Sequence, residues 1–584
     1  MWLLKLNRTP RLILICVLLG VIGALGAQLF LLLLHLVDTH VLSGIGRYQT
    51  ISVEAAHAMR TPPAPFSQWY WWIPVSTTLG GLVAGVLIYT LAPETEGHGT
   101  DASLIAFHRN NGRMRARVPL VKTIVSAITI GSGGSGGREG PTAQIASGAG
   151  AIVGHLFRLS DEERRIVILI GMAAGLSAIF KSPLGTAIFA VEILYSRMAF
   201  EGDALLYTLI SASVAYSITG AFSGYTPLFL LHPDSRALVP LDLVWFSLLG
   251  VLAGGLGALM PTVYYRIRDA FVALRVPRFI KPAIGGLAVG LIGIAAPPII
   301  GGGYGYMQFV LQGTSGFGVG LLLFLTFGKL LTLSLSVGSG GSGGVFGPTL
   351  YIGVMFGAAF AALLHLFHVN IDSTWLAVVG MAAVFAGAAR VPIAAMVMVI
   401  EMTGGFQLIM PSMLAVSLAF IVQLTLTRHA KHPTIYDAQA PTPADSPVYH
   451  DLFYQTAANL LRRQQVRLDE DILSSELQAA LDRGEGVALR HSTERLYSLE
   501  IAAGSPVAGR EIRALGLGDI GALIVGLIRG ESEIVPNGGT KLQVGDGLLV
   551  ATSTGAIDRF RALIAPPETG SDPVDKAFVT EPPA

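Results

Sequence analysis

The chain has 584 residues, of which 52% are hydrophobic and only 13% are charged. Soluble domains carry about a quarter of their residues as charged side chains, so an ordinary soluble protein is excluded for most of the chain. The net charge of +1 gives no electrostatic basis for a nucleic-acid partner. The single cysteine, Cys16, excludes an intramolecular disulfide framework.

Long apolar segments predict helices that cross a bilayer, which takes about 20 apolar residues. The first segment, 12–34, is too long for a signal-peptide core and lacks a clear cleavage site behind it, so we expect a retained helix. Six further segments predict spans: 73–91, 205–222, 241–264, 284–300, 318–337 and 408–426.

Shorter apolar segments, broken by glycine and proline, lie between these spans. Interrupted helices are tolerated at membrane depth only where they are buried in protein or line an aqueous path. This pattern favours a transporter or channel over an enzyme held by a simple anchor. The segments are 118–130, 142–156, 166–180, 184–194, 349–366, 375–388 and 393–400.

The sequence contains an internal duplication. Residues 131–142 read GSGGSGGREGPT and residues 338–349 read GSGGSGGVFGPT, which differ only at RE against VF. A second similar pair lies at 171–192 and 380–401. Duplicated halves with broken helices at corresponding places indicate a transport site. A flexible linker, the alternative for the glycine runs, would not recur with the same proline-headed apolar segment behind it.

Each glycine run ends in Gly-Pro, at Gly140-Pro141 and at Gly347-Pro348. Proline is favoured at the first helical position because its missing N–H would have no partner there, so Pro141 and Pro348 predict helices that open within the membrane. A helix N-terminus presents unpaired N–H groups and a partial positive charge. Two such termini close together would hold a small anion weakly, as rapid conduction requires.

Glu139 immediately precedes the first of these expected helices. A carboxylate inside a membrane domain is unfavourable unless it has a role, so we expect Glu139 to be a gate. Ionised, it would occupy the position of the anion; protonated or displaced, it would vacate the path. The alternative is a helix-capping carboxylate, with Arg138 as its partner. The repeat places Phe346 at the equivalent position, where an aromatic edge would line the path.

The motifs GREGP at 137–141 and GVFGP at 344–348 resemble the signature motifs of the CLC chloride channels and chloride/proton exchangers. This resemblance implies an all-α polytopic membrane protein with two inverted-topology halves whose broken helices meet at the membrane midplane. It also implies a homodimer with one pore per subunit. Glu139 would be the gating glutamate, and the implied anion-binding residues are Gly97, His98, Gly99, Arg138, Gly140, Val345, Phe346 and Tyr436, with backbone N–H groups supplied by Val345 and Phe346.

His98 departs from the family pattern. In the segment Gly97-His98-Gly99-Thr100-Asp101 it stands where a serine hydroxyl commonly contacts the ion, and the usual proline is absent. A neutral imidazole donates one hydrogen bond, and a protonated one would bind an anion more strongly, so the preference between chloride and fluoride stays open. A solvent-facing loop histidine is the alternative.

Two further positions bear on the mechanism. Tyr436, in the segment PTIYD, would be the phenol donor of the inner site, with an interfacial anchor as the alternative. Exchangers of the family often carry a proton-carrying glutamate ten residues after the equivalent of Pro183, and this position is Ile193. Isoleucine cannot relay a proton, which favours a voltage-gated chloride channel over an exchanger with a different inner proton path. The neighbouring Glu192 has Glu401 as its repeat partner, which indicates a shared structural role.

The connection 107–122 carries basic residues, and short basic loops mark the cytoplasmic side of a membrane. We therefore expect a multi-pass protein of the inner membrane with both termini in the cytoplasm. The basic residues are Arg109, Arg113, Arg115, Arg117 and Lys122.

The composition changes near residue 440, where APTP reads as a linker and charges become frequent. Strands are predicted at 496–501, 522–529 and 547–551 from short apolar segments between Gly, Asn and Asp turns. The stretches GSPVAGREI, IVGLIRG and LQVGDGLLVA resemble the ligand-binding subdomain of RCK (TrkA-C) regulators. This implies a small cytoplasmic α+β domain that dimerises and senses a small ligand, or one that only stabilises a dimer. The expected divisions are 1–439 for transport, 440–494 for a linker and a helical stretch, 495–570 for regulation and 571–584 for a disordered tail.

Enzymatic function is disfavoured, because the sequence has no HExxH motif and no pair of carboxylates within one predicted span. We expect no cofactor and no metal. A cation transporter is disfavoured because cation sites need converging carbonyls or acidic rings, whereas repeated helix starts offer N–H donors. The expected partners are the lipid bilayer, chloride or another halide and, for an exchanger, protons, with no nucleic acid.

Overall fold

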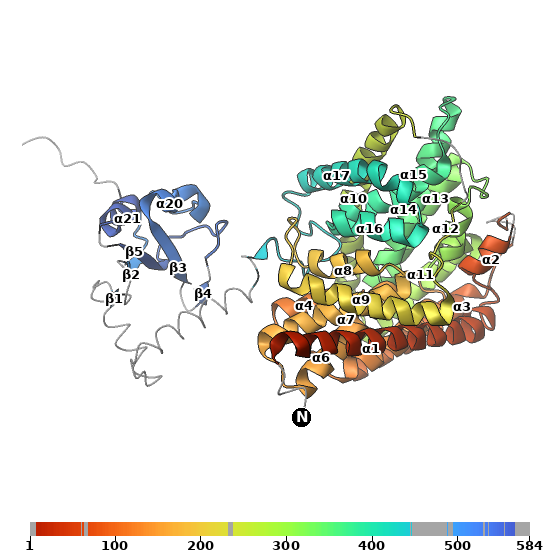
Figure 1. Ribbon diagram of the computed structural model, residues 1–584, viewed down its shortest axis with the longest axis horizontal. Coiled ribbons are helices and arrows are strands. Elements are labelled where there is room, and N and C mark those ends of the chain that lie inside the picture. The colour runs from red at the N-terminus through yellow and green to blue at the C-terminus, as the bar shows by residue number, and fades with distance from the viewer. Residues whose placement is uncertain are drawn as a thin grey trace, which may run out of the picture. The chain divides into compact units, whose positions relative to one another are not determined.

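The computed structural model describes residues 7–59, 61–63, 68–231, 238–443, 446, 487–488, 494–529, 532–534, 536–553 and 555–566. The chain divides into two compact units, Met1–Pro443 and Ala444–Ala584 (Figure 1). The helical stretch expected within 440–494 and the expected tail 571–584 fall outside the described residues, apart from 440–443, 446, 487–488 and 494.

The described part of the first unit is built from helices. In Figure 1 the helices up to α9 run from red to yellow and those from α10 onward from yellow-green to cyan. The first group comprises α1 (Arg8–Val37), α2 (Val53–Ala58), α3 (Ile73–Leu91), α4 (Thr100–His108), α5 (Arg117–Gly131), α6 (Glu139–Leu156), α7 (Asp161–Phe180), α8 (Pro183–Glu192) and α9 (Gly202–Ser223). The second comprises α10 (Asp242–Ala273), α11 (Lys281–Ala295), α12 (Tyr304–Leu311), α13 (Val319–Gly338), α14 (Phe346–Leu366), α15 (Ser373–Ala389), α16 (Pro392–Thr403) and α17 (Ile409–Leu426).

Eight helices among the described residues are long and apolar enough to cross a membrane. Seven of them coincide with the predicted spans. The eighth is α14, which we expected to be a short piece beginning near residue 349. It begins at Phe346 instead, and α6 likewise begins at Glu139, two residues before the expected start at proline. Each proline still lies in the first helical turn, where its missing N–H would have no partner inside the helix.

The helix α7 is also longer than its apolar stretch predicted, because a polar first turn precedes that stretch. Ser160 and Glu163 form a capping box, in which the serine oxygen accepts from the Glu163 N–H at 3.3 Å and the glutamate accepts from the Ser160 N–H at 3.1 Å. Such reciprocal bonds pair two N–H groups that a helix start otherwise leaves open. The helix therefore begins at Asp161.

The two halves contain equivalent broken helices that run in opposite directions. Near the end of α8, Glu192 accepts hydrogen bonds from the first turn of α16, including one of 2.7 Å from the Ala394 N–H. Within α16, Glu401 accepts hydrogen bonds from the first turn of α8, including one of 2.8 Å from the Gly185 N–H. Each helix thus presents its C-terminal part to the start of the other. The equivalent helices are antiparallel, which confirms the predicted inverted-topology halves.

The described residues of the second unit form an antiparallel five-stranded sheet with strand order β1-β2-β5-β3-β4. Phe560 and Ile564 of α21 (Ile557–Ile564) pack with Leu527, Leu548 and Val550 of the sheet in one apolar core. The three predicted strands are present, and the α+β class is confirmed. The strands are β1 (Val487–Ala488), β2 (Glu494–Glu500), β3 (Ala522–Arg529), β4 (Ser532–Ile534) and β5 (Gly547–Ser553), and a short helix, α20 (Leu517–Ile520), precedes β3.

Candidate anion pathway

The glycine runs of the two halves meet and hold four helix N-termini together. Gly137 and Gly344 exchange two hydrogen bonds of 2.7 Å, each N–H donating to the carbonyl of the other. The loop before α4 pairs in the same way with the second glycine run, and the loop before α12 pairs with the first. These bonds run from the Gly97 N–H to the Gly341 carbonyl at 3.1 Å and from the Gly301 N–H to the Gly133 carbonyl at 3.3 Å. The starts of α4, α6, α12 and α14 therefore converge.

Two fully buried lysines at equivalent positions, Lys122 on α5 and Lys329 on α13, support these loops. Each Nζ donates to two carbonyls of the loop that precedes a short helix, α4 or α12. The prediction that Lys122 belongs to a basic connection was wrong, because Lys122 lies fully buried in α5. The acceptors are Thr95 at 3.0 Å and Gly97 at 2.8 Å for Lys122, and Ile299 at 3.3 Å and Gly301 at 2.6 Å for Lys329.

Glu139, the first residue of α6, is fully buried and is held by donors from other helices. Its Oε1 accepts a hydrogen bond from the hydroxyl of Tyr304 at the start of α12. Its Oε2 accepts one of 3.2 Å from the Gly347 N–H in the first turn of α14. Arg138 Nε lies 4.0 Å from Oε1, and the guanidinium carbon lies 4.5 Å from the centre of the Tyr304 ring. The carboxylate thus occupies a helix N-terminus of the other half of the protein.

Val345 and Phe346 lie at the start of α14 and are almost fully buried. The N–H groups of the first helical residues have no acceptor within their own helix, so this start can present donors to an anion. The Phe346 ring packs against three other rings, which fixes its orientation. The ring-centre distances are 4.0 Å to Phe385, 4.6 Å to Phe180 and 5.4 Å to Phe189.

His98 and Tyr436, which are 338 positions apart, lie against each other. The ring centres are 5.4 Å apart with the planes at 73°, and the exposed fractions are only 6% and 1%. Neither residue therefore faces solvent as a loop histidine or an interfacial anchor would. The Nδ1 of His98 and the hydroxyl of Tyr436 have no hydrogen-bond partner among the described residues.

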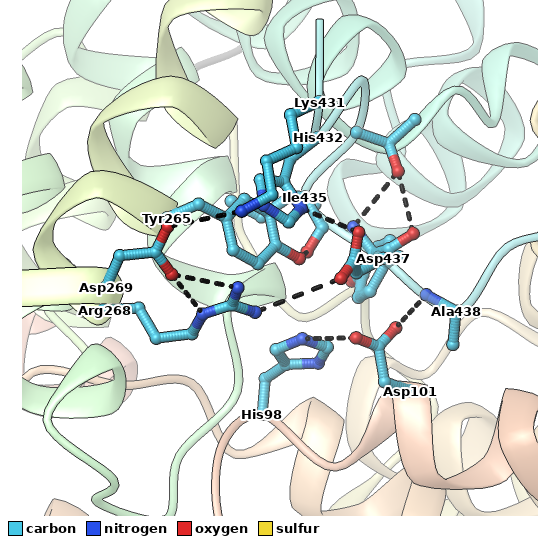
Figure 2. A network of polar contacts seen from close by, with 12 residues as sticks. His98, Asp101, Tyr265, Arg268, Asp269, Lys431, His432, Ile435, Asp437 and Ala438 are labelled. Carbon is cyan, nitrogen blue, oxygen red and sulfur yellow. Dashed lines mark hydrogen bonds and ion pairs between the residues drawn. The ribbon is translucent and has the colours of Figure 1, made fainter. Parts of the chain in front are cut away.

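A polar network fixes the segment that carries Tyr436 (Figure 2). The Tyr265 hydroxyl of α10 donates to the Ile435 carbonyl at 3.0 Å. Asp437 is hydrogen-bonded to His432 Nδ1 at 2.8 Å and forms an ion pair with Arg268 at 4.0 Å. In Figure 2 dashed lines also join His98 to Asp101 and Asp101 to Ala438. His98 Nε2 lies 3.2 Å from Asp101 Oδ2, and Asp101 Oδ1 accepts a hydrogen bond of 3.3 Å from the Ala438 N–H.

Comparison with known proteins identifies the first unit. A family model described as voltage gated chloride channel matches residues 80–424, which is more than half of the chain. The chain belongs to the voltage gated chloride channel (CLC) family. A second model, the TrkA-C domain, matches residues 496–565, so the recognition of both domains is confirmed. The chain is accordingly a multi-pass membrane protein of a transporter family.

Three similar proteins place this CLC chain among its relatives. The H(+)/Cl(-) exchange transporter ClcA of Yersinia pestis is 32% identical over 345 residues, which cover 58% of this chain and 71% of the relative. The crystal structure of a slow cyanobacterial Cl-/H+ antiporter is 25% identical, with a TM-score of 0.60 over 73% of this chain and 95% of the other. The structure of a CLC-type fluoride/proton antiporter also has a TM-score of 0.60, with 21% identity, over 74% and 96% of the two chains. This last likeness concerns the fold alone.

Two cavities border the CLC site, and their lining residues are related by the repeat. One, of about 470 Å³, is lined by residues that include His98, Asp101 and Arg268. The other, of about 510 Å³, is lined by residues that include Arg138 and Tyr304. The loop 97–99 lines the first cavity and the equivalent loop 301–303 lines the second, so the inverted repeat relates the two openings.

The predicted glycines have geometric roles at the site. Gly97 and Gly99 adopt φ values of 74° and 87°, a region that side-chain-bearing residues rarely enter. A Cβ on Gly140 would lie 2.1 Å from the His98 carbonyl oxygen. Glycine at these positions therefore allows the loop before α4 to turn and to approach α6.

Sequence reasoning missed Tyr304, the hydroxyl donor to Glu139. A signal was present, because Gly301-Gly302-Gly303-Tyr304 occupies the place in the second half that Gly97-His98-Gly99-Thr100 occupies in the first. The equivalent lysine contacts of the two loops make this correspondence visible. Ile193, the position of interest for proton transfer, is fully buried at the end of α8.

Proposed function

We propose that the chain transports chloride across a membrane and that Glu139 is its gate. The observation that carries the proposal is the fully buried Glu139 carboxylate, which accepts hydrogen bonds from the Tyr304 hydroxyl and from the N-terminal turn of α14. These donors suit an anion as well as a carboxylate, since a helix N-terminus combines free N–H groups with a partial positive charge. The carboxylate therefore competes with chloride for the same donors.

Protonation or displacement of Glu139 removes this competition. A protonated carboxyl group loses its attraction to the helix terminus and frees the donors for an anion. The neighbouring Val345 and Phe346 N–H groups and the Tyr436 hydroxyl then supply the next contacts toward the cavity that His98 lines. Arg138 adds positive charge beside the gate, 4.0 Å from Oε1.

Proton-coupled exchange is the mode of transport that we propose, because a relative of 32% identity is named as an exchanger. A second candidate is a voltage-gated channel, which the buried, apolar Ile193 favours. The two modes differ in a measurable quantity: the reversal potential shifts with a pH gradient for an exchanger and does not shift for a channel.

The test is a flux measurement on the full chain reconstituted in liposomes. An outward chloride gradient should drive chloride efflux together with uphill proton movement in the native protein. Glu139→Gln should keep chloride transport and lose proton coupling, because a neutral amide at the gate has no proton to exchange. Glu162→Gln, at a half-exposed position paired with Arg8, is the matched control and should behave as the native protein does.

Absence of chloride flux in the native protein would contradict the proposal, as would unchanged proton coupling in Glu139→Gln. Competition between chloride and fluoride in the same assay determines the preferred halide. Fluoride selectivity would contradict our choice of chloride.

We also propose a homodimer in the inner membrane with both termini in the cytoplasm. The TrkA-C region, with expected boundaries 495–570, would then regulate transport by binding a small ligand such as a nucleotide. Cross-linking in native membranes tests the dimer, and transport with and without added nucleotide tests the regulation.

A further inference from the structure

His98 has two ring nitrogens in different environments. Nε2 lies 3.2 Å from Asp101 Oδ2, whereas Nδ1 is buried without a hydrogen-bond partner among the described residues (Figure 2). A nitrogen lone pair directed at a carboxylate would be repelled, so the hydrogen of a neutral imidazole resides on Nε2. In the neutral ring Nδ1 is then an acceptor that carries a lone pair.

This tautomer has a consequence for anion binding. An anion beside a neutral His98 would face the Nδ1 lone pair, and no hydrogen bond would form. When Nδ1 gains a proton, the imidazolium donates from both nitrogens, to Asp101 on one side and to the anion on the other. The Asp101 carboxylate, 3.2 Å from Nε2, lies where it can accept the hydrogen bond from the imidazolium.

We infer that His98 is a proton-linked chloride ligand: chloride bound next to Tyr436 arrives together with a proton on Nδ1, and Asp101 enforces this linkage by holding the hydrogen of the neutral ring on Nε2. The inference rests on the proposed function and extends it, because it assigns a second protonatable group to the same path. The proton comes from water in the 470 Å³ cavity that His98 and Asp101 line, and it returns there when chloride leaves. Proton access on this side then does not require a carboxylate at position 193.

Other polar and charged groups face this part of the path from each neighbouring element. The Tyr264 ring of α10 lies 6.4 Å from the His98 ring, and the Lys122 Nζ of α5 donates to the adjacent Gly97 carbonyl at 2.8 Å. The groups that can influence His98 are Asp101 on α4, Glu94 and Glu96 before it, Arg113 and Arg115 after it, Lys122 on α5, Gln144 on α6, Tyr264, Tyr265 and Arg268 on α10, and His432, Tyr436 and Asp437 after α17.

Chloride binding to the full chain in detergent tests the inference. All variants carry Glu139→Gln, so that protonation of the gate does not contribute. Titration calorimetry between about pH 6 and pH 9 covers the range in which a histidine changes charge, and buffers of different ionisation enthalpy count the protons taken up. Chloride affinity should fall about tenfold per pH unit above the histidine titration, with about one proton taken up per chloride.

Three further variants identify the group responsible. His98→Gln keeps a donor that does not titrate, so its chloride affinity should not change with pH. In Asp101→Asn the carboxylate no longer holds the hydrogen of the neutral ring on Nε2. The neutral imidazole can then donate from Nδ1, so the pH dependence of chloride affinity should become smaller. His155→Gln removes an exposed histidine in the last turn of α6, outside the network that holds Tyr436, and it should keep the full pH dependence.

A pH-independent affinity in the Glu139→Gln protein would overturn the inference while leaving the proposed transport intact. A full pH dependence that survives in His98→Gln would overturn it too. If His98→Gln does not bind chloride, the Asp101→Asn variant tests the inference instead. An undiminished pH dependence of its chloride affinity would contradict the role of the tautomer. Absence of chloride binding in the native and Glu139→Gln proteins would instead contradict the proposed function itself.

Discussion

Glu139, the carboxylate that we propose as the gate, accepts a hydrogen bond from the phenol of Tyr304, which comes from the other half of the protein. The ring of Tyr304 also lies under the Arg138 guanidinium, so the hydroxyl and the ring have separate partners. A hydrogen bond to a charged group contributes roughly 1.5–3 kcal/mol. That is enough to change the fraction of time for which the carboxylate stays at the helix N-terminus.

Tyr304→Phe should therefore open the gate more often. The substitution removes the hydroxyl and keeps the ring, so the loss of about 1.5 kcal/mol or more favours the displaced carboxylate about tenfold. We expect faster chloride efflux from liposomes, with the largest gain at alkaline pH, where Glu139 is ionised. Tyr306→Phe, which changes a buried tyrosine of the same helix, is the control and should have little effect. An unchanged rate in Tyr304→Phe would show that the hydroxyl does not hold the gate.

At this scale the sequence predicts residues on the repeated motifs and misses their distant partners. The motif GREGP placed Glu139 at a helix start, and the structure has it as the first residue of α6. Tyr304 lies 165 positions further on, and its contact depends on the crossing of the halves, which no local pattern specifies. The burial of His98 against Tyr436 depends in the same way on how the segment after α17 folds back.

The helix starts are the elements that organise the site. Side chains of one half accept hydrogen bonds from N–H groups of the other half. Each half therefore supplies acceptors for the helix N-termini of the other half. Glu192 and Glu401 do this for α16 and α8, and their equivalence fits the structural role that the repeat indicated.

Glu192→Gln should consequently affect stability more than proton coupling. An amide oxygen accepts hydrogen bonds from the Ile393 and Ala394 N–H groups less strongly than a carboxylate does. Buried donors whose acceptor is weakened lower the free energy of unfolding by roughly 1–3 kcal/mol. We expect a lower thermal midpoint in detergent and an unchanged ratio of chloride to protons in liposomes. Glu401→Gln should produce the same pair of results. A changed ratio in Glu192→Gln alone would instead give that residue a part in proton transfer.

A second prediction concerns the close approach of the α6 start to the loop before α4. Gly140→Ala would place a Cβ about 2.1 Å from the His98 carbonyl oxygen, which is far below a van der Waals contact, so the loop must move. We expect loss of chloride transport and weaker chloride binding. Gly255→Ala is the matched control, since a Cβ at that position on α10 meets nothing within 4 Å. Normal transport in Gly140→Ala would mean that the loop position does not matter for the path.

For the molecule as a whole, the duplication predicted more of the architecture than the apolar segments did. Apolar length identified seven spans, but the boundaries of α7 and α14 depend on capping contacts and on the glycine loops. The repeat indicated two halves and the family resemblance implied their inverted topology, whereas the hydrogen bonds by which Glu192 and Glu401 join α8 and α16 became visible only in the structure. In the second unit, short apolar segments between turn residues predicted three strands. The order β1-β2-β5-β3-β4 could not be deduced, because strand pairing is not a local property.

The second unit should respond to acid through one ion pair. Arg529 donates to both oxygens of the fully buried Asp546 at 2.7 Å, and this pairing holds the pKa of Asp546 below its ordinary value of 3.8. A lowered folded pKa means that the unfolded unit binds the proton more readily. The pair therefore contributes its full stability above about pH 3.8 and loses it as the pH falls through the folded pKa.

Asp546→Asn removes this contribution in the full chain. At pH 7 we expect faster amide hydrogen exchange in β3 and β5 than in the native protein, because the end of β3 loses its tie to the turn before β5. The difference should persist at about pH 5 and shrink below the ordinary pKa, where the native pair is itself lost. Asp558→Asn, which changes an exposed carboxylate on α21, should exchange as the native protein does. Equal amide exchange at pH 7 in Asp546→Asn and in the native protein would contradict the role of this pair. If the pair ties the strands together, the loss of a buried carboxylate that accepts two hydrogen bonds from one guanidinium must speed the exchange.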